Sequence, residues 1–201
     1  MSPAPSDPEE GQRPTLILIA GYARAGKDTL ASGILEWCKR GAAQVNFADP
    51  LKEAGNAYLE YLHLPGDFFN EQFKVENRDF LIAAGRLARS IDKDVFAKNL
   101  VNYLPFIGPD ENGDEHDIVV CSDWRYTNEW IVAADTLLEH NWLLRTIYVE
   151  TAGVGPANDE EAYSILDLRM NVTFDQEFYF KPNARQEIMA EGRRLAQTWQ
   201  L

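Results

Sequence analysis

The feature that most constrains this chain is a short apolar run, residues 16–20 (LILIA), which leads directly into the sequence GYARAGK. Gly21 and Gly26 give this stretch the spacing G-x-x-x-x-G-K, which is typical of a phosphate-binding loop when it joins a strand to a helix. Glycine permits positive φ angles and close backbone approach, so successive amide groups can turn onto one anion. Residues 28–37 are predicted to form a helix whose N-terminal amides and dipole complete this anion site.

Side chains at the end of the loop add candidate ligands. Lys27 would place a positive charge at the β- and γ-phosphates of a nucleotide. Asp28 stands where a serine or threonine usually helps to hold magnesium, and Thr29 offers a hydroxyl one residue later. The alternative interpretation is a glycine-rich turn with a solvent-exposed lysine, but the strand–loop–helix context favours the phosphate site.

Bulk properties limit the remaining possibilities. A chain of 201 residues with 45% hydrophobic residues can form one sizeable core, so we expect a single domain. The net charge of −13 repels polyanions, so polymeric nucleic acid and anionic membranes are not expected partners. The two cysteines have no metal-ligand spacing, and no apolar run is long enough to cross a bilayer, so a cytoplasmic protein is expected. Residues 1–14, with four prolines, are predicted to be a disordered leader.

Short apolar runs alternate with longer helical segments, which predicts an α/β fold with a mostly parallel sheet between two layers of helices. In such a fold the site lies at the carboxyl ends of the strands. Residues 105–115 and 151–161 are rich in glycine, proline and acids, which favours surface loops. The expected strands are residues 16–20, 44–48, 118–121, 143–149 and 166–174. The expected helices are residues 28–37, 51–62, 78–91, 95–103, 127–139 and 184–199.

A second candidate site follows the apolar run at residues 118–121. Asp123 ends this segment, and an aspartate at the end of a buried strand can hold magnesium beside a phosphate loop. The alternative is an aspartate that caps a helix or turn. Arg125 could reach the phosphoryl group in transfer, where positive charge is needed. Trp124 and Tyr126 could stack on a base, although aromatic residues at such positions more often pack in the core or at its rim.

Basic residues gather between the second and third predicted strands, which is notable in so acidic a chain. The arginines among them have helical spacing, and planar guanidinium groups bind phosphate with two hydrogen bonds. The cluster therefore predicts a site for an acceptor that already carries one phosphate, whereas the alternative is an exposed face of ion pairs. Its members are Lys52, Lys74, Arg78, Arg86 and Arg89.

Four stretches together resemble the phage-type deoxynucleoside monophosphate kinases, within the P-loop nucleoside monophosphate kinases. They are residues 21–29 (GYARAGKDT), 46–52 (NFADPLK), 78–89 (RDFLIAAGRLAR) and 119–129 (VVCSDWRYTNE). The resemblance implies one three-layer P-loop kinase domain over residues 15–201, with acceptor-binding helices at about 50–104 and a lid-like segment at about 151–167. It also implies that the γ-phosphate of ATP is transferred to a deoxynucleoside 5′-monophosphate, with Mg²⁺ as cofactor, in the host cytoplasm if a phage encodes the chain.

The resemblance further implies roles for particular residues. Lys27, Asp123 and Arg125 would form the reaction centre, and Asp28, Thr29 and Asp123 would hold the metal ion. The ATP-binding residues would be Gly21, Arg24, Ala25, Gly26, Lys27, Asp28 and Thr29. The acceptor site would comprise Lys52, Lys74, Arg78, Arg86, Arg89 and Trp124, with Arg78 and Arg89 on the acceptor phosphate.

Two matters stay open at the level of sequence. Nucleotide kinases commonly close an arginine-bearing lid, but residues 151–167 contain neither lysine nor arginine. Arg24, Arg125 or Arg169 would then supply the charge, or the lid would act by excluding water. The other open matter is the acceptor, which could instead be a small metabolite or a modified base, and a non-catalytic nucleotide-binding regulator is a further alternative. The accepted base and sugar are undetermined, and a homodimer is possible.

Overall fold

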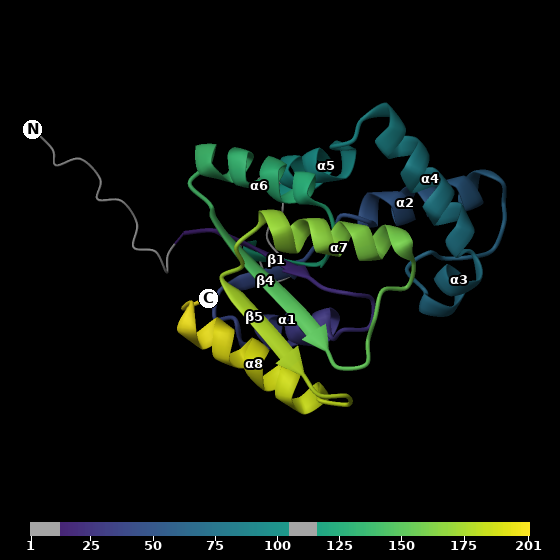
Figure 1. Cartoon of the computed structure of the whole chain (residues 1–201). Coiled ribbons are helices and arrows are strands. Elements are labelled where there is room, and N and C mark those ends of the chain that lie inside the picture. Colours follow the sequence, from purple (N-terminus) through teal and green to yellow (C-terminus); the bar gives the residue numbers. More distant parts are fainter. Residues whose placement is uncertain (1–12, 105–115) are drawn as a thin grey trace, which may run out of the picture.

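The computed structural model describes residues 13–104 and 116–201. In this part of the chain five strands form a single sheet in the order β2-β3-β1-β4-β5, and all four neighbouring pairs are parallel (Figure 1). β1 lies at the centre of the sheet, so the predicted phosphate-binding loop (residues 21–27, the phosphate loop) emerges from the middle of its carboxyl edge. The strands are β1 (Thr15–Ala20), β2 (Gly41–Gln44), β3 (His116–Trp124), β4 (Leu143–Thr151) and β5 (Gln176–Phe180).

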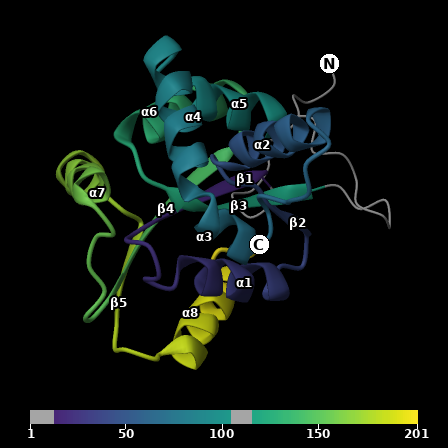
Figure 2. The same ribbon diagram turned by 90° about the vertical axis from the view of Figure 1, so that its right-hand side faces the viewer.

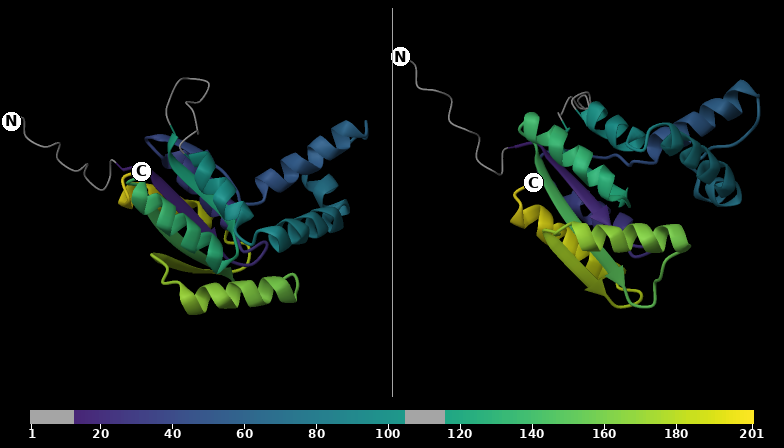
Figure 3. Two further views of the ribbon diagram at one scale, coloured as in Figure 1. Left: turned by 90° about the horizontal axis from the view of Figure 1, so that it is seen from above. Right: turned by 45° about the horizontal axis from the view of Figure 1, so that its top comes forward.

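Helices cover both faces of the sheet, as the alternating pattern predicted. α1 and α8 lie on one face, and α5, α6 and α7 pack on the other (Figure 2). α2, α3 and α4 project beyond the sheet as a separate group of helices (Figure 3). The helices are α1 (Lys27–Trp37), α2 (Asp49–Tyr61), α3 (Glu71–Glu76), α4 (Arg78–Ile91), α5 (Val95–Tyr103), α6 (Thr127–Glu139), α7 (Asp159–Asn171) and α8 (Arg185–Thr198).

The alternation of side chains along β1 divides the core into two. Leu16 and Leu18 face the layer of α5, α6 and α7, whereas Ile17 and Ile19 face α1 and α8. Every residue of β1 is buried, which explains why this strand is a continuous apolar run rather than an alternating one. The three-layer α/β fold predicted from the sequence is therefore confirmed.

Glycines bring α1 and α8 into close contact, which fixes the helix that follows the phosphate loop. A Cβ atom at Gly33 would lie 2.6 Å from the carbonyl oxygen of Met189, and one at Gly192 would lie 2.6 Å from that of Leu30. Larger side chains would force the two helices apart. The N-terminus of α1 is thereby held against the sheet.

Two predicted strands are wrong in extent or type. The strand expected at 44–48 is β2 at Gly41–Gln44, because the next residues leave the sheet: the amides of Phe47 and Ala48 donate to the Asp123 carboxylate at 2.9 and 3.0 Å. Residues 166–171 of the strand expected at 166–174 are instead the end of α7, residues 172–174 follow that helix, and the last strand is β5. Asn158 begins α7 by accepting a hydrogen bond from the Glu161 amide, and Ile165 and Leu168 then face the core at helical spacing.

Three further sequence predictions concern the lid-like segment, the leader and the loop at 105–115. The lid-like segment at 151–167 contains the end of β4, an exposed stretch at 152–158 and the first part of α7. The predicted leader, apart from residues 13 and 14, and the predicted loop at 105–115 lie outside the described residues. Within the described ranges, no helix combines the length and the apolar character needed to cross a lipid bilayer.

Candidate functional site

The phosphate loop adopts the backbone conformation that its glycines anticipate. Gly21 and Gly26 have φ angles of 145° and 100°, and Arg24 between them has a φ of 67°. A Cβ atom at Gly21 would lie 2.2 Å from the carbonyl oxygen of Val149 on β4, so this position requires glycine. The hydroxyl of Thr151 at the end of β4 donates to the Ala25 carbonyl at 2.9 Å. The loop is therefore fixed between β4 and α1.

Lys27 lies at the centre of the predicted site. Its ammonium group is buried and donates to the carbonyls of Gly21 at 2.9 Å and Tyr22 at 2.8 Å. Burial, and next the positive charge of Arg125, lower the pKa of Lys27 to about 8, while nearby carboxylates raise it. Those carboxylates belong to Asp28, Glu161 and Asp123. The predicted reaction-centre residues Lys27, Asp123 and Arg125 are thus close enough to interact electrostatically.

Asp28 is linked to the end of β3 rather than pointing away from the site. Its carboxylate accepts a hydrogen bond of 2.6 Å from the hydroxyl of Ser122, the residue before Asp123. The Asn46 side chain in turn accepts from the Ser122 amide at 3.0 Å. The sequence interpretation did not include Ser122 or Asn46, although both lie in the segments on which it depended.

The donor set suits Mg²⁺ only together with a bound phosphate. No group of three or more His, Cys, Asp or Glu side chains in the described ranges is arranged to hold a metal ion. Mg²⁺ usually takes one or two protein ligands and completes its octahedron with water and phosphate oxygens. Asp28 and Thr29 at the start of α1 fit that pattern, since carboxylate and hydroxyl oxygens are ligands that this ion accepts.

Asp123 has a structural role that the sequence did not reveal. Its two carboxylate oxygens accept from the amides of Phe47 and Ala48, and the Cys121 thiol donates to one of them at 3.2 Å. These bonds tie the end of β3 to the turn that starts α2. A carboxylate has about four acceptor positions, so a contact with magnesium stays a prediction in addition to this positioning role.

Trp124 does not belong to a binding surface, and the prediction that it stacks on a base is wrong. Its side chain is fully buried, its indole nitrogen donates to the Tyr126 carbonyl at 3.0 Å, and its ring packs against Phe174. The pairing of β3 with β1 shifts register between Cys121 and Trp124, and this irregularity puts Trp124 in the same core as Val119 and Cys121, under α5, α6 and α7.

The predicted basic cluster is divided in the structure. Arg78 lies eleven residues before Arg89 on α4, which is about 16 Å along the helix axis, so the two are not adjacent on one phosphate. Lys74 pairs with Glu71 within α3, and Lys52 pairs with Asp49 at 2.7 Å within α2. A single cluster of all five basic residues is therefore wrong, and Arg86 is the member that forms an ion pair with α7.

Arg89 is held between two aromatic rings. The centre of its guanidinium group lies 4.7 Å from the ring centroid of Phe96 and 4.6 Å from that of Tyr126. Stacking of this kind fixes the plane of the group while leaving its N–H edges able to donate. Tyr126, which with Trp124 is a candidate from the sequence for stacking on a base, lies against Arg89 and thus orients a predicted acceptor ligand.

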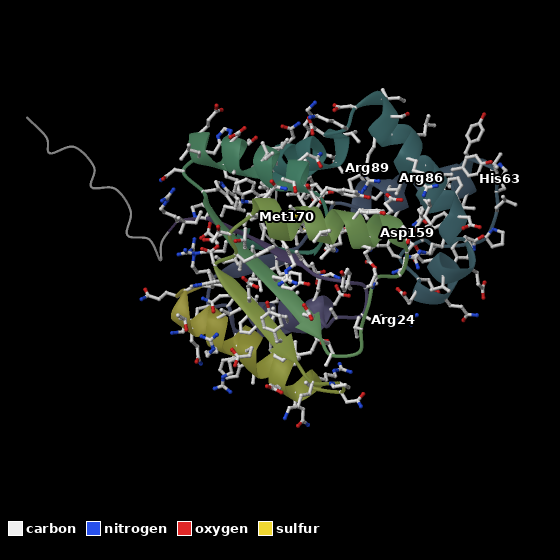
Figure 4. The ribbon with its side chains drawn as sticks, in the orientation of Figure 1. Arg24, His63, Arg86, Arg89, Asp159 and Met170 are labelled. Carbon is white, nitrogen blue, oxygen red and sulfur yellow. The ribbon has the colours of Figure 1, made fainter. Side chains whose placement is uncertain are left out.

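The most informative residues that sequence reasoning missed are two acids at the start of α7. Glu161 is 3% exposed and accepts from the amide of Ala23 in the phosphate loop at 3.0 Å. Glu160 forms an ion pair of 3.1 Å with Arg86 of α4. Figure 4 shows the neighbouring Asp159 between Arg24 of the loop and the two arginines of α4. The spacing of Asn158 and Glu161, which is typical of a helix N-terminus, was the available signal.

A third acid, Glu129, organises the segment that carries Arg125. One oxygen of its buried carboxylate accepts from the amides of Arg125 at 3.0 Å and Tyr126 at 3.1 Å. Burial is the main cause that raises the pKa of Glu129 to about 7, and the nearby Asp123 carboxylate adds to the effect. The two amide bonds oppose this rise but do not cancel it.

The raised pKa makes stability depend on pH. Between pH 4.5 and 7 the Glu129 carboxyl binds a proton more readily in the folded than in the unfolded chain, so its contribution to stability falls as pH rises.

The variant Glu129→Gln tests this pH dependence. It keeps an oxygen for both amides and removes the charge, so we expect it to abolish up to about 3 kcal/mol of the free energy of unfolding that the wild type loses as pH rises. Urea unfolding at pH 5 and pH 8 measures the effect. Glu139→Gln, at the exposed end of the same helix, is the control, and an equal pH dependence in wild type and Glu129→Gln would contradict the assignment.

Comparisons with known proteins find only distant structural likenesses. No protein-family model matches the chain, and no curated protein is significantly similar to it in sequence. Its fold is similar to that of a sugar kinase from Janibacter sp. HTCC2649, with 12% identity and a TM-score of 0.43 over 92% of this chain and 93% of that one. A gluconokinase from Sinorhizobium meliloti 1021 is similar at 13% identity and a TM-score of 0.44, over 93% and 97%. Likenesses this distant do not bear on the substrate or the activity.

Proposed function

We propose that this chain is an ATP- and Mg²⁺-dependent phosphotransferase whose acceptor already carries a phosphate, with a deoxynucleoside 5′-monophosphate as the substrate. The observation that carries the proposal is that two kinds of anion ligand lie on either side of one helix end. A phosphate loop with Lys27 lies on one side of the start of α7, and Arg86 lies on the other, one helical turn from the stacked Arg89.

The donor half consists of the loop and the start of α1. The amides around Gly26 and Lys27 would surround the β- and γ-phosphates, with the N-terminus of α1 adding its dipole. The Lys27 ammonium would exchange its bonds to the Gly21 and Tyr22 carbonyls for phosphate oxygens. Asp28 and Thr29 would hold Mg²⁺, and the ion would supply positive charge to the phosphates.

The acceptor half consists of the arginines of α4 and the aromatic side chains that position them. Because Phe96 and Tyr126 fix the plane of the Arg89 guanidinium, little side-chain entropy is lost when two of its N–H groups bind a phosphate. An acceptor phosphate held there faces the donor loop across the start of α7. This arrangement favours an acceptor with its own negative charge.

Transfer between two phosphates needs positioning and charge rather than acid–base chemistry. An oxygen of the acceptor phosphate forms a new bond to the γ-phosphorus as the bond to the β–γ bridging oxygen breaks, and ADP leaves with that electron pair. Lys27 and Arg125 supply positive charge where it is needed as the phosphoryl group moves. No general base is required because the acceptor oxygen is already ionised.

A second candidate function is a kinase for a hydroxyl acceptor. Glu161 is the observation that favours it, since a carboxylate beside a phosphate loop can take the proton of an attacking hydroxyl. This alternative leaves the stacked Arg89 without a role, which is why we place it second.

A panel of acceptors tests the proposal. The purified chain is supplied with ATP and Mg²⁺, and ADP release is followed by a coupled assay. The panel comprises deoxynucleoside and nucleoside monophosphates, modified monophosphates, free nucleosides and sugars. We expect ADP release above the ATP-only background with monophosphates alone. Turnover with sugars or nucleosides only would favour the hydroxyl-acceptor kinase, whereas ATP binding without turnover on any acceptor would favour a non-catalytic regulator.

A further inference from the structure

The carboxylate of Glu161 accepts a hydrogen bond from an amide of the loop that is predicted to bind phosphate. It accepts from the Ala23 amide of the phosphate loop with one oxygen and from the Ala157 amide, at 2.6 Å, with the other. The same carboxylate lies 3.9 Å from the guanidinium of Arg125. At 3% exposure it is a buried negative charge on the very loop whose amides are arranged to bind phosphate.

Glu160 makes an equivalent pair of contacts on the acceptor side. Its two carboxylate oxygens accept separately, at 2.7 Å from the Tyr126 hydroxyl and at 3.1 Å from Arg86. The hydrogen bond from Tyr126, followed by that from Arg86, lowers the pKa of Glu160, so this carboxylate is ionised at neutral pH. The carboxylate of Glu161 therefore binds the phosphate loop, and the carboxylate of the preceding residue, Glu160, binds Arg86 and Tyr126 on the acceptor side.

The chain just before α7 is mostly exposed, whereas the second half of the helix carries buried side chains. Gly153 has a φ of 83°, and a Cβ atom at either Gly153 or Gly155 would meet no atom within 4 Å. In contrast, Ile165 and Leu168 in the second half of α7 are buried in the core. If the first turn of α7 separated from the site, these buried side chains would keep the rest of the helix attached to the sheet.

We propose that Glu160 and Glu161 form a latch in which two carboxylates take the positions of substrate phosphates in the ligand-free protein, and that substrate phosphates displace them. The proposal rests on the proposed function, because it assigns the same amide and arginines to phosphates when substrates are bound. Release of Glu161 would free Arg125 to turn toward the transferring group only once ATP is present. The latch therefore keeps Arg125 from its place beside the transferring group until the substrates bind.

A latch of this kind lowers the apparent affinity for ATP, because part of the binding free energy is used to displace the carboxylate. Glu161→Gln keeps the size of the side chain but has only one acceptor oxygen for the two amides and no negative charge. We expect the dissociation constant of a non-hydrolysable ATP analogue with Mg²⁺ to fall about 10-fold, the effect of weakening one charged hydrogen bond. Titration calorimetry without acceptor measures it.

Asp159→Asn is the matched control. It removes the same charge from the same helical turn, but Asp159 is exposed and makes none of the latch contacts, so the dissociation constant should change less than about 2-fold. Equal gains in affinity in both variants would show a general charge effect and overturn the latch. Unchanged or weaker binding in Glu161→Gln, with wild type still binding the analogue, would overturn the latch and leave the proposed function in place. Failure of wild type to bind the analogue would overturn both.

Hydrogen exchange on the wild-type chain provides a test that does not depend on a variant folding. The Ala157 amide donates to the Glu161 carboxylate at 2.6 Å, so it loses its acceptor when that carboxylate leaves its position. We expect this amide to exchange faster when the ATP analogue and Mg²⁺ are bound. Slower or unchanged exchange of the Ala157 amide in the saturated complex would contradict the latch.

Discussion

Replacing Lys27 with methionine is expected to lower kcat/KM by about 10²–10³-fold, the effect of removing one group that stabilises transition-state charge. Lys27 lies at the start of α1, is buried, and binds the carbonyls of the phosphate loop, so it is already in place when a triphosphate enters. Methionine fills the same space without a charge. The coupled ADP-release assay with a productive monophosphate acceptor measures the loss.

Lys39→Met is the control for this variant. Lys39 lies just beyond the far end of α1 and is exposed, so the same substitution there should leave turnover unchanged. Thermal unfolding of the two variants shows whether the fold is retained. Unchanged turnover in folded Lys27→Met would contradict the assignment of the loop to the triphosphate, since no other lysine in the described ranges is bonded to this loop.

Replacing Arg89 with alanine is expected to raise the KM for the acceptor by about 10- to 100-fold, with little effect on ATP affinity. The stacked guanidinium is lost together with its two potential bonds to phosphate. Arg89→Lys keeps a charge but has neither the planar fork nor the same stacking, so we expect it to recover only a small part of the loss. Steady-state kinetics with varied acceptor at saturating ATP separates KM from kcat.

A second stacked arginine provides the matched control. Arg193 on α8 lies over the ring of Trp37 at 3.5 Å, on the opposite face of the sheet from α5 and α6. Arg193→Ala loses a similar packing contact, so it should affect stability but not the KM for the acceptor. If Arg89→Ala weakened ATP binding alone, the assignment of Arg89 to the acceptor would be wrong.

Local features of the fold were predictable from the sequence because their causes are local. The apolar run before Gly21, the glycines and Lys27 predict a strand, a loop and a helix, and these are β1, the phosphate loop and α1. The helices α4, α5 and α6 have the predicted bounds within about a residue, since each combines an apolar stripe with a polar residue near its start.

Other elements depended on partners far away in the chain. β2 ends at Gln44 because Asp123, about eighty residues later, binds the amides of Phe47 and Ala48. The sequence predicts a loop at 151–161 because its glycines, proline and acids favour one, but Asp159 already begins α7. A strand–loop boundary set by a distant carboxylate has no local signal.

Residues adjacent in the chain are enough to predict a buried parallel sheet and a loop suited to phosphate. The charges that meet depend instead on the packing of segments that are distant in the sequence. The tertiary structure buried Trp124, separated Arg78 from Arg89, and brought Glu160 and Glu161 between Arg86 and the loop. The physical reason is that a parallel sheet brings the carboxyl ends of strands distant in sequence to one edge, where their loops and helix ends become neighbours.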